Sequence, residues 1–508
     1  MRKGAVLMLV FVLANAHALC AATQTPPVAP APQLPAQHTA PPRQPNIVLI
    51  LADDLGSAEL GCTGSKVLHT PHIDALRARG ISFTAAYSGA PVCAPSRCIL
   101  LTGRDSLHAQ IRDNGEMPNQ VPRLGASANA ADNQTRFGGQ RGLQQSTQTL
   151  ATILRDAGYA TGCFGKWGLG GAHPDHLQGH PLHQGFDRFF GYLCQRNAHS
   201  YWPEYLESDF ERSALDGNSR AQGKTWAPDR ITAEALAWMQ QVRDQPFMLY
   251  FPSIIPHLAL QAPTELVAAI PDIPGDSAYD GKRGYQACAR PRATYTAMVQ
   301  RLDEHVGQLV ATARNLGILQ RTVFIVLSDN GATWDIGGYD PDYFRGNAAL
   351  RGHKGQVYEG GLRIPFIASL DGATIAASTC TLPVAHQDIL PTLCALAGAP
   401  QPKECEGTSL AAWIIGSAGP STRAPLAWEF PQGAGAQAVR MGQWKGVRLG
   451  GRKNAAAPLA LYDLAADPVE AHDVAAAHSD IVVAMLQLLA QRTSATIPDW
   501  DFPEVEKR

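Results

Sequence analysis

The chain has 508 residues, of which 45% are hydrophobic and 17% charged, and its formal net charge is -2 at pH 7. This length and apolar content allow a large core and more than one domain, since a domain averages about 150 residues. The near-neutral charge, with no basic stripe and no acidic tail, predicts that the protein has no nucleic-acid partner.

The N-terminus has the three parts of a secretory signal peptide, which we place at residues 1–22. Arg2 and Lys3 precede an apolar run over 5–14 and a small-x-small sequence over 16–18. We therefore expect an exported protein, periplasmic or secreted. The apolar run is too short to span a bilayer, so we expect no stable membrane insertion.

Two further features lie near the end of this signal and beyond it. Cys20 could carry a lipid anchor, but the three residues before it are a poor lipid-attachment sequence, and we do not expect anchoring. Residues 23–45 are rich in Pro, Ala and Gln and have little to bury. This composition predicts a flexible linker.

Buried strands and amphipathic helices alternate after residue 45. Apolar runs with β-branched residues predict strands over 46–52, 247–251, 322–327 and 364–369. Apolar spacings of three and four predict helices over 147–157, 229–242, 295–316 and 386–397, with Asp229 as an N-cap. This order predicts an α/β domain over 46–420, with a mainly parallel central sheet flanked by helices.

The character of the chain changes near residue 420. Short runs over 427–430, 438–441 and 444–448 are typical of antiparallel strands, and 480–492 predicts a closing helix. We therefore expect a smaller C-terminal domain of antiparallel sheet and helix over 421–508.

Three of the predicted strands run directly into polar groups. The first is followed by Asp53 and Asp54, the second leads to His257, and the third leads to Asp329 and Asn330. Ligand sites of open α/β sheets lie beyond the carboxyl ends of the strands, so these groups should converge on one crevice. Their hard oxygens favour Ca²⁺ or Mg²⁺, and a cation would offset the repulsion between the carboxylates. Taken singly, the same residues could be a helix cap and a plain turn.

The run Val92-Cys93-Ala94-Pro95-Ser96-Arg97, with Thr102-Gly103-Arg104 close behind, resembles the maturation signature of the type I sulfatases. This family belongs to the alkaline phosphatase superfamily. The resemblance implies that a maturation enzyme oxidises Cys93 to formylglycine, whose hydrate is the nucleophile, beside one Ca²⁺ ion rather than Mg²⁺. Without its neighbours, Cys93 would be read as an ordinary buried thiol.

The resemblance also implies roles for other residues. Asp53, Asp54, Cys93, Asp329 and Asn330 match the metal ligands of the family, and Asp329 is also the expected base. Arg97 matches the arginine that holds formylglycine, and Lys166 matches a lysine that contacts the hydrate and the sulfate. His257 and Lys354 match the pair beside the scissile oxygen.

The chain departs from the family at one position. Many members have His two residues after the lysine, where this chain has Gly168. His199 and His108 are candidates to supply the missing imidazole. The departure leaves the hydrogen bonding around the nucleophile open, but not the class of reaction.

Substrate contacts are expected in loops that mix polar and aromatic side chains. Arg112, His199 and Trp202 are plausible sugar contacts, although they could equally pack and cap loops. We therefore expect an exported sulfatase that acts on a sulfated carbohydrate. The alternatives are a phosphoester or phosphonate hydrolase of the same superfamily, and a non-catalytic glycan-binding relative.

Eight cysteines remain besides Cys20 and Cys93. An even number permits disulfides in an exported protein, but the sequence does not assign the pairing. No Cys-x-x-Cys or His/Cys cluster has the spacing of a zinc site. Asn133-Gln134-Thr135 fits a glycosylation sequon, a short match that is also frequent by chance.

Overall fold

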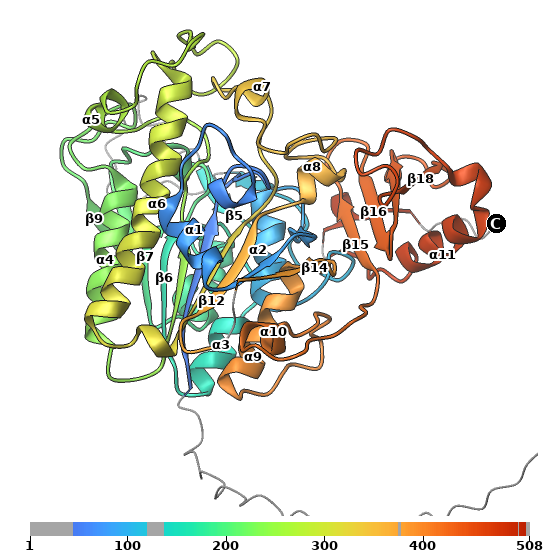
Figure 1. Cartoon of the computed structure of the whole chain (residues 1–508), viewed down its shortest axis with the longest axis horizontal. Helices are drawn as coiled ribbons and strands as arrows, with labels where there is room; N and C mark the ends of the chain where they lie inside the picture. Colours follow the sequence, from blue (N-terminus) through green and yellow to red (C-terminus); the bar gives the residue numbers. More distant parts are fainter. Residues whose placement is uncertain (1–43, 119–136, 374–376, 496, 504–508) are drawn as a thin grey trace, which may run out of the picture. The chain divides into compact units, whose positions relative to one another are not determined.

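The computed structural model describes residues 44–118, 137–373, 377–495 and 497–503. The described residues form one compact unit (Figure 1). The predicted signal peptide, nearly all of the linker and the sequon at Asn133 lie outside the described residues. The domain boundary at 420 stays a prediction.

The centre of the fold is a ten-stranded sheet with the order β13-β2-β12-β11-β1-β10-β6-β7-β8-β9. The five neighbours from β11 to β7 are all parallel, and antiparallel pairs flank them on both sides. The prediction of a mainly parallel sheet in an α/β fold is therefore confirmed. The strands are β1 Asn46–Ala52, β2 Ile81–Phe83, β6 Ala160–Lys166, β7 Arg188–Tyr192, β8 Tyr205–Ser208, β9 Glu211–Ala214, β10 Phe247–Pro252, β11 Thr322–Ser328, β12 Phe366–Leu370 and β13 Ser378–Cys380.

Helices cover both faces of this sheet, because the central strands are apolar on both faces. Along β1, Ile47, Leu49 and Leu51 belong to one buried cluster, and Val48 and Ile50 belong to another. The first cluster is completed by α2 Cys93–Thr102, α3 Leu150–Asp156 and α9 Ile389–Ala397, and the second by α1 Pro71–Ala78, α4 Ala227–Gln241 and α6 Pro291–Asn315 (Figure 1). Short helices are α5 Thr264–Ala268, α7 Pro341–Phe344, α8 Glu359–Leu362 and α10 Ala411–Ile414.

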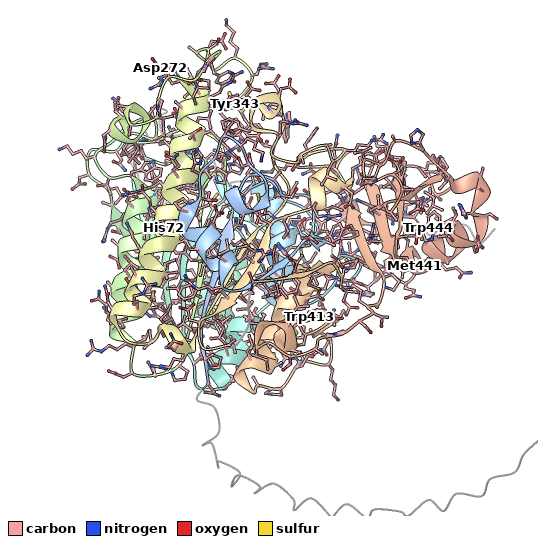
Figure 2. The ribbon with its side chains drawn as sticks, viewed as in Figure 1. His72, Asp272, Tyr343, Trp413, Met441 and Trp444 are labelled. Carbon is pink, nitrogen blue, oxygen red and sulfur yellow. The ribbon has the colours of Figure 1, made fainter. Side chains whose placement is uncertain are left out.

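The predicted C-terminal sheet and helix are present. The strands β15 Leu426–Phe430, β16 Ala436–Met441, β17 Trp444–Leu449 and β18 Leu459–Asp463 form an antiparallel sheet, against which α11 Ser479–Leu489 packs. Trp444, labelled in Figure 2, lies on this sheet with its ring 4.6 Å from that of His478. Two small pairs complete the fold: β3 Ala86–Tyr87 with β14 Val384–Ala385, and β4 Glu116–Pro118 with β5 Phe137–Gln140.

Two details differ from the sequence predictions. Asp229 is not an N-cap, because α4 begins two residues earlier and the carboxylate accepts hydrogen bonds from Arg301 and His305 of α6. The strands β6 and β7 were not predicted, because their glycines weaken the apolar pattern. Gly165 of β6 is needed for close approach, since a Cβ there would lie 2.0 Å from the carbonyl oxygen of Pro252 on β10.

Within the described residues, no helix combines the length and the apolar character that a membrane crossing requires. The structure also forms no disulfide among the cysteines it describes.

Candidate active site

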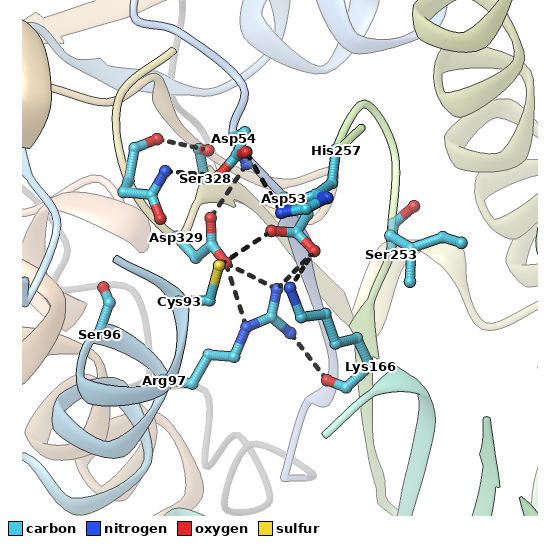
Figure 3. A network of polar contacts seen from close by, with 12 residues as sticks. Asp53, Asp54, Cys93, Ser96, Arg97, Lys166, Ser253, His257, Ser328 and Asp329 are labelled. Atoms are coloured by element: carbon cyan, nitrogen blue, oxygen red, sulfur yellow. Dashed lines mark hydrogen bonds and ion pairs between the residues drawn. The ribbon is translucent and has the colours of Figure 1, made fainter. Parts of the chain in front are cut away.

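Polar side chains gather where four neighbouring parallel strands end. Asp53 and Asp54 follow β1, Asp329 and Asn330 follow β11, and Lys166 is the last residue of β6. His257 lies five residues beyond the end of β10. Figure 3 shows most of these groups around one centre, which is where ligands bind in open α/β sheets.

Cys93 opens helix α2 at the edge of this centre. Val92 before it is extended, and Gly103 ends the helix with a φ of 66°. The Cys93 side chain is buried, and its Sγ lies 3.4 Å from Oδ1 of Asp53 (Figure 3). Burial and the Asp53 carboxylate raise the pKa of this thiol to about 12. The thiol is therefore protonated at neutral pH and is a poor nucleophile as it stands.

Three basic side chains pair with the three carboxylates of the centre. Arg97 lies 2.7 Å from Asp329, Lys166 lies 2.7 Å from Asp53, and Lys354 lies 2.8 Å from Asp54. Burial alone would lower the pKa of Lys354, but Asp54 raises it well above its ordinary value. Arg97, Lys166 and Lys354 thus offset the charge of the three carboxylates, so the repulsion between the carboxylates does not by itself require a metal ion.

The oxygens of the site can nevertheless hold a metal ion. Ligand atoms of Asp53, Asp54, Cys93 and His257 lie within 4.8 Å of one another. Asn330 donates from Nδ2 to Asp54 at 2.8 Å, whereas its buried Oδ1 has no hydrogen-bond partner within the part of the chain that the structure describes. A buried carbonyl oxygen without a partner is costly, and a hard cation would satisfy it. Asn330 therefore fits the metal-ligand role that the sequence predicted.

Asp329 differs from the other predicted ligands. Its Oδ2 accepts two hydrogen bonds from Arg97, at 2.7 and 3.1 Å, and its Oδ1 accepts one from the backbone of Asp54 at 3.1 Å. It also lies outside the group of ligand atoms within 4.8 Å. The contacts with Arg97 and Asp54 still tie Asp329 to helix α2 and to the loop after β1.

His257 stands above the carboxylates as a neutral imidazole. Burial, Lys354 and Lys166 lower its pKa well below the usual value. Its Nδ1 donates to the carbonyl of Leu258, so Nε2 carries the free lone pair, 3.6 Å from Asp54. The ring stacks on His199 at a centroid distance of 4.9 Å. His199 is thus a neighbour of the site.

The other predicted contacts lie elsewhere. His108 pairs with Asp105 and Glu406, which belong to none of the groups above. Trp202 is half-buried and lines a cavity with Lys224 and Glu265.

The structure contradicts the prediction that Arg112 contacts the substrate. Its side chain is 2% exposed, and its guanidinium donates to Glu429 at 3.1 Å and to the carbonyls of Ala109, Leu107 and Thr493. These bonds secure the C-terminal segment and leave the guanidinium no freedom to bind a sugar.

Two aromatic residues beside the site were not predicted. The Tyr285 ring lies 5.6 Å from that of His199 and 6.2 Å from that of His257. Trp334 is 39% exposed, with its ring 5.3 Å from that of His353, the neighbour of Lys354. Neither lies in a motif, so only the fold reveals their position.

Comparison with known proteins agrees with this geometry. The family model "Sulfatase" matches residues 45–399. The chain belongs to the sulfatase family and is a sulfuric ester hydrolase. It is 31% identical to human arylsulfatase A over 507 residues, covering 90% of this chain and 89% of that protein.

Two further similarities concern proteins whose names or structures include a sugar. The chain is 31% identical to the mouse N-acetylgalactosamine-6-sulfatase, covering 72% of this chain and 64% of that protein. Among solved structures, the complex of Ps i-CgsB with k-i-k-neocarrahexaose aligns with a TM-score of 0.71 at 26% identity, covering 91% of this chain and 94% of that one. The alkaline phosphatase-like sulfatase fold expected from the sequence is thereby confirmed.

Proposed function

We propose that this protein is an exported sulfatase that hydrolyses sulfate monoesters of carbohydrates, through formylglycine made from Cys93 and one bound Ca²⁺. The observation that carries the proposal is the position of Cys93. Its side chain is buried against Asp53, in a centre that also holds the charged groups of Arg97, Lys166 and Lys354. Such a centre suits an anion that is attacked at the residue 93 position.

The state of Cys93 supports the modification. A thiol whose pKa is raised to about 12 cannot act as a thiolate near neutral pH. When formed, the aldehyde hydrate would supply a nucleophilic oxygen, and its second hydroxyl lets sulfate depart as the aldehyde returns. Because Cys93 is only 1% exposed, a maturation enzyme must reach it before the chain folds.

The charges of the site match an anionic substrate once a cation is added. Three carboxylates and three basic side chains balance, so a divalent ion makes the centre net positive. The oxygens of Asp53, Asp54, Asp329 and Asn330 would hold Ca²⁺, which would offset charge on the sulfate oxygens. Lys166 and Lys354 add donors for those oxygens.

Two residues would transfer protons, one as a base and the other as an acid. Asp329, whose Oδ2 accepts hydrogen bonds from Arg97, would take a proton from the nucleophile. His257 would give a proton to the departing alcohol from Nε2, since its Nδ1 is committed to Leu258. A bound sulfate ester brings negative charge beside His257, which favours the imidazolium that this role requires.

A carbohydrate substrate is supported by the surroundings of the site. The rings of Tyr285 and of the exposed Trp334 lie close to those of His257 and His353. Sugar rings bind to such faces, with polar groups fixing their orientation. The similarity to N-acetylgalactosamine-6-sulfatase points the same way.

The test compares matched substrates on the matured enzyme. We expect an aryl sulfate to be hydrolysed much faster than the corresponding aryl phosphate, and one isomer in a panel of mono-sulfated galactose, N-acetylgalactosamine and N-acetylglucosamine to be preferred. Faster phosphate hydrolysis would instead support the phosphoester or phosphonate hydrolase. Binding of the sugars without turnover would support a non-catalytic glycan-binding protein.

A further inference from the structure

Gly168, the position where this chain lacks the histidine of many sulfatases, is packed against Gln195. Gly168 has a φ of 76°, and a Cβ built on it would lie 2.6 Å from both Cγ and Nε2 of Gln195. The Gln195 side chain therefore fills the space that a side chain at position 168 would need.

The side-chain amide of Gln195 is buried, and its hydrogen bonding is incomplete. The residue is 5% exposed, and its Nε2 has no hydrogen-bond partner among the described residues. Its backbone is fixed, because its N–H donates to Oε1 of Gln140 at 2.9 Å. A buried N–H₂ group without an acceptor costs about 1–3 kcal/mol, so a ligand that accepts its hydrogen bond is expected.

Gln195 also belongs to the segment that borders the reaction centre. Lys166 of β6 pairs with Tyr192 of β7, and the N–H of Gly168 donates to the carbonyl of Leu193 at 3.1 Å. The chain thus leaves both strands at the sheet edge where Lys166 contacts Asp53. Four residues beyond Gln195, His199 stacks on His257.

We propose that the Gln195 amide donates a hydrogen bond to the sulfate group of the substrate, in the place of the side chain that is missing at position 168. The inference rests on the proposed sulfatase function. A neutral amide can donate but cannot transfer a proton, so Gln195 would stabilise the anion without acid–base chemistry. His199 is the less suitable replacement, because its ring face is committed to His257.

Two substitutions distinguish the hydrogen bond that Gln195 donates from the packing of its side chain. Gln195→Met keeps the length of the side chain and removes the donor, and Gln195→Glu keeps the shape but places a carboxylate near the sulfate. On matured enzyme we expect kcat/KM for an aryl sulfate to fall about 10- to 100-fold for Gln195→Met, the value of one hydrogen bond to a charged group, and further for Gln195→Glu. The inhibition constant of inorganic sulfate should rise in the same order.

A control and a rescue complete the design. Gln184 is also a buried glutamine, but its Nε2 donates to the carbonyls of Gln144 and Gln178. Gln184→Met should lower Tm and leave sulfate inhibition unchanged. Asn is among the non-glycine residues that best tolerate positive φ, so Gly168→Asn should recover part of the activity of Gln195→Ala, but should be harmful alone because it clashes with Gln195.

The outcomes distinguish this inference from the proposed function. If Gln195→Met keeps kcat/KM and sulfate inhibition within twofold of an active wild type, the inference is overturned while the sulfatase function stands. A loss of sulfate affinity confined to His199→Ala would also overturn it. A wild type that hydrolyses no sulfate ester refutes the proposed function itself.

Discussion

Arg97 holds Asp329 through two hydrogen bonds to one carboxylate oxygen, at 2.7 and 3.1 Å, and neither side chain is exposed. The pair joins helix α2, which carries Cys93, to the loop after β11. Removing one partner leaves the other charge buried and uncompensated, which costs about 3–5 kcal/mol.

We therefore expect Arg97→Met to lower the free energy of unfolding by about 3 kcal/mol and to abolish activity. Urea denaturation followed by circular dichroism measures the first effect. Arg283→Met is the matched control, because its pair with Asp335 is exposed and contributes little to stability. Equal losses of stability in the two variants would contradict the structural role of Arg97.

His257 should matter most for poor leaving groups, because they need the proton that it donates. For His257→Ala we expect kcat to fall about 10²–10⁴-fold on an alkyl or sugar sulfate. The loss should be much smaller on a nitrophenyl sulfate, whose leaving group needs no proton. A series of aryl sulfates measures this as a steeper dependence on leaving-group pKa, and an unchanged slope would remove His257 from this role.

His386 links stability to pH. Its Nε2 donates to the carbonyl of Ser328, its Nδ1 lies 3.0 Å from the Ser96 hydroxyl, and burial lowers its pKa to about 4. Between pH 6.5 and 4 the unfolded chain binds a proton that the folded chain does not. Stability should therefore fall as the pH is lowered through this window, with a contribution of up to about 1.4 kcal/mol per pH unit.

Urea denaturation between pH 4 and 7 tests this link. His386→Asn should flatten the decline below pH 6.5, whereas His472→Asn should not, because the His472 side chain is 83% exposed. A pH profile that is the same in His386→Asn and in the wild type would show that this histidine does not set the acid limit.

Removal of the divalent ion should stop turnover. After chelation we expect activity to be lost and to return with Ca²⁺ more fully than with Mg²⁺ at equal concentration. Calcium at about 100 times its Kd should add about 2.7 kcal/mol to the stability of the folded protein. Asp54→Asn should weaken this effect, and Asp105→Asn, in the separate group with His108 and Glu406, should not. Full activity in a chelated, metal-free sample would exclude a metal role.

The C-terminal sheet is joined to the catalytic part by a buried pair. Lys445 of β17 lies 2.8 Å from Glu359 of α8, and both side chains are fully buried. We expect Lys445→Met to lower the free energy of unfolding by about 3 kcal/mol. Lys282→Met should have almost no effect, since Lys282 is 84% exposed. If Lys445→Met lowers the free energy of unfolding as little as Lys282→Met does, the pair does not hold the C-terminal sheet to helix α8.

Much of this fold and part of the site could be predicted from the sequence. The continuous apolar runs of β1 and β11 identify central strands, and the polar residues after them identify the edge that carries the site. Strand β6 was missed because Gly162 and Gly165 interrupt its pattern, although its last residue is Lys166. A local sequence pattern does not show where two strands need glycine because their backbones lie close together.

The remaining errors concern contacts between distant segments. Nothing in the sequence near Arg112 shows that its guanidinium forms an ion pair with Glu429, which is more than 300 residues away. The basic partners of Asp53, Asp54 and Asp329 likewise come from other strands, helices and loops. Only the structure shows that these partners offset the charge of the three carboxylates. Tyr285, Trp334 and Gln195 border the site without any motif of their own.

We propose above that residue 93 carries the nucleophile in the mature protein. Mass spectrometry of the tryptic peptide 80–97, from protein made in a host with a maturation enzyme, measures the state of this residue directly. We predict the mass of an aldehyde residue at position 93, in a fraction of molecules that rises in proportion to sulfatase activity. An unmodified thiol in fully active protein would contradict the account.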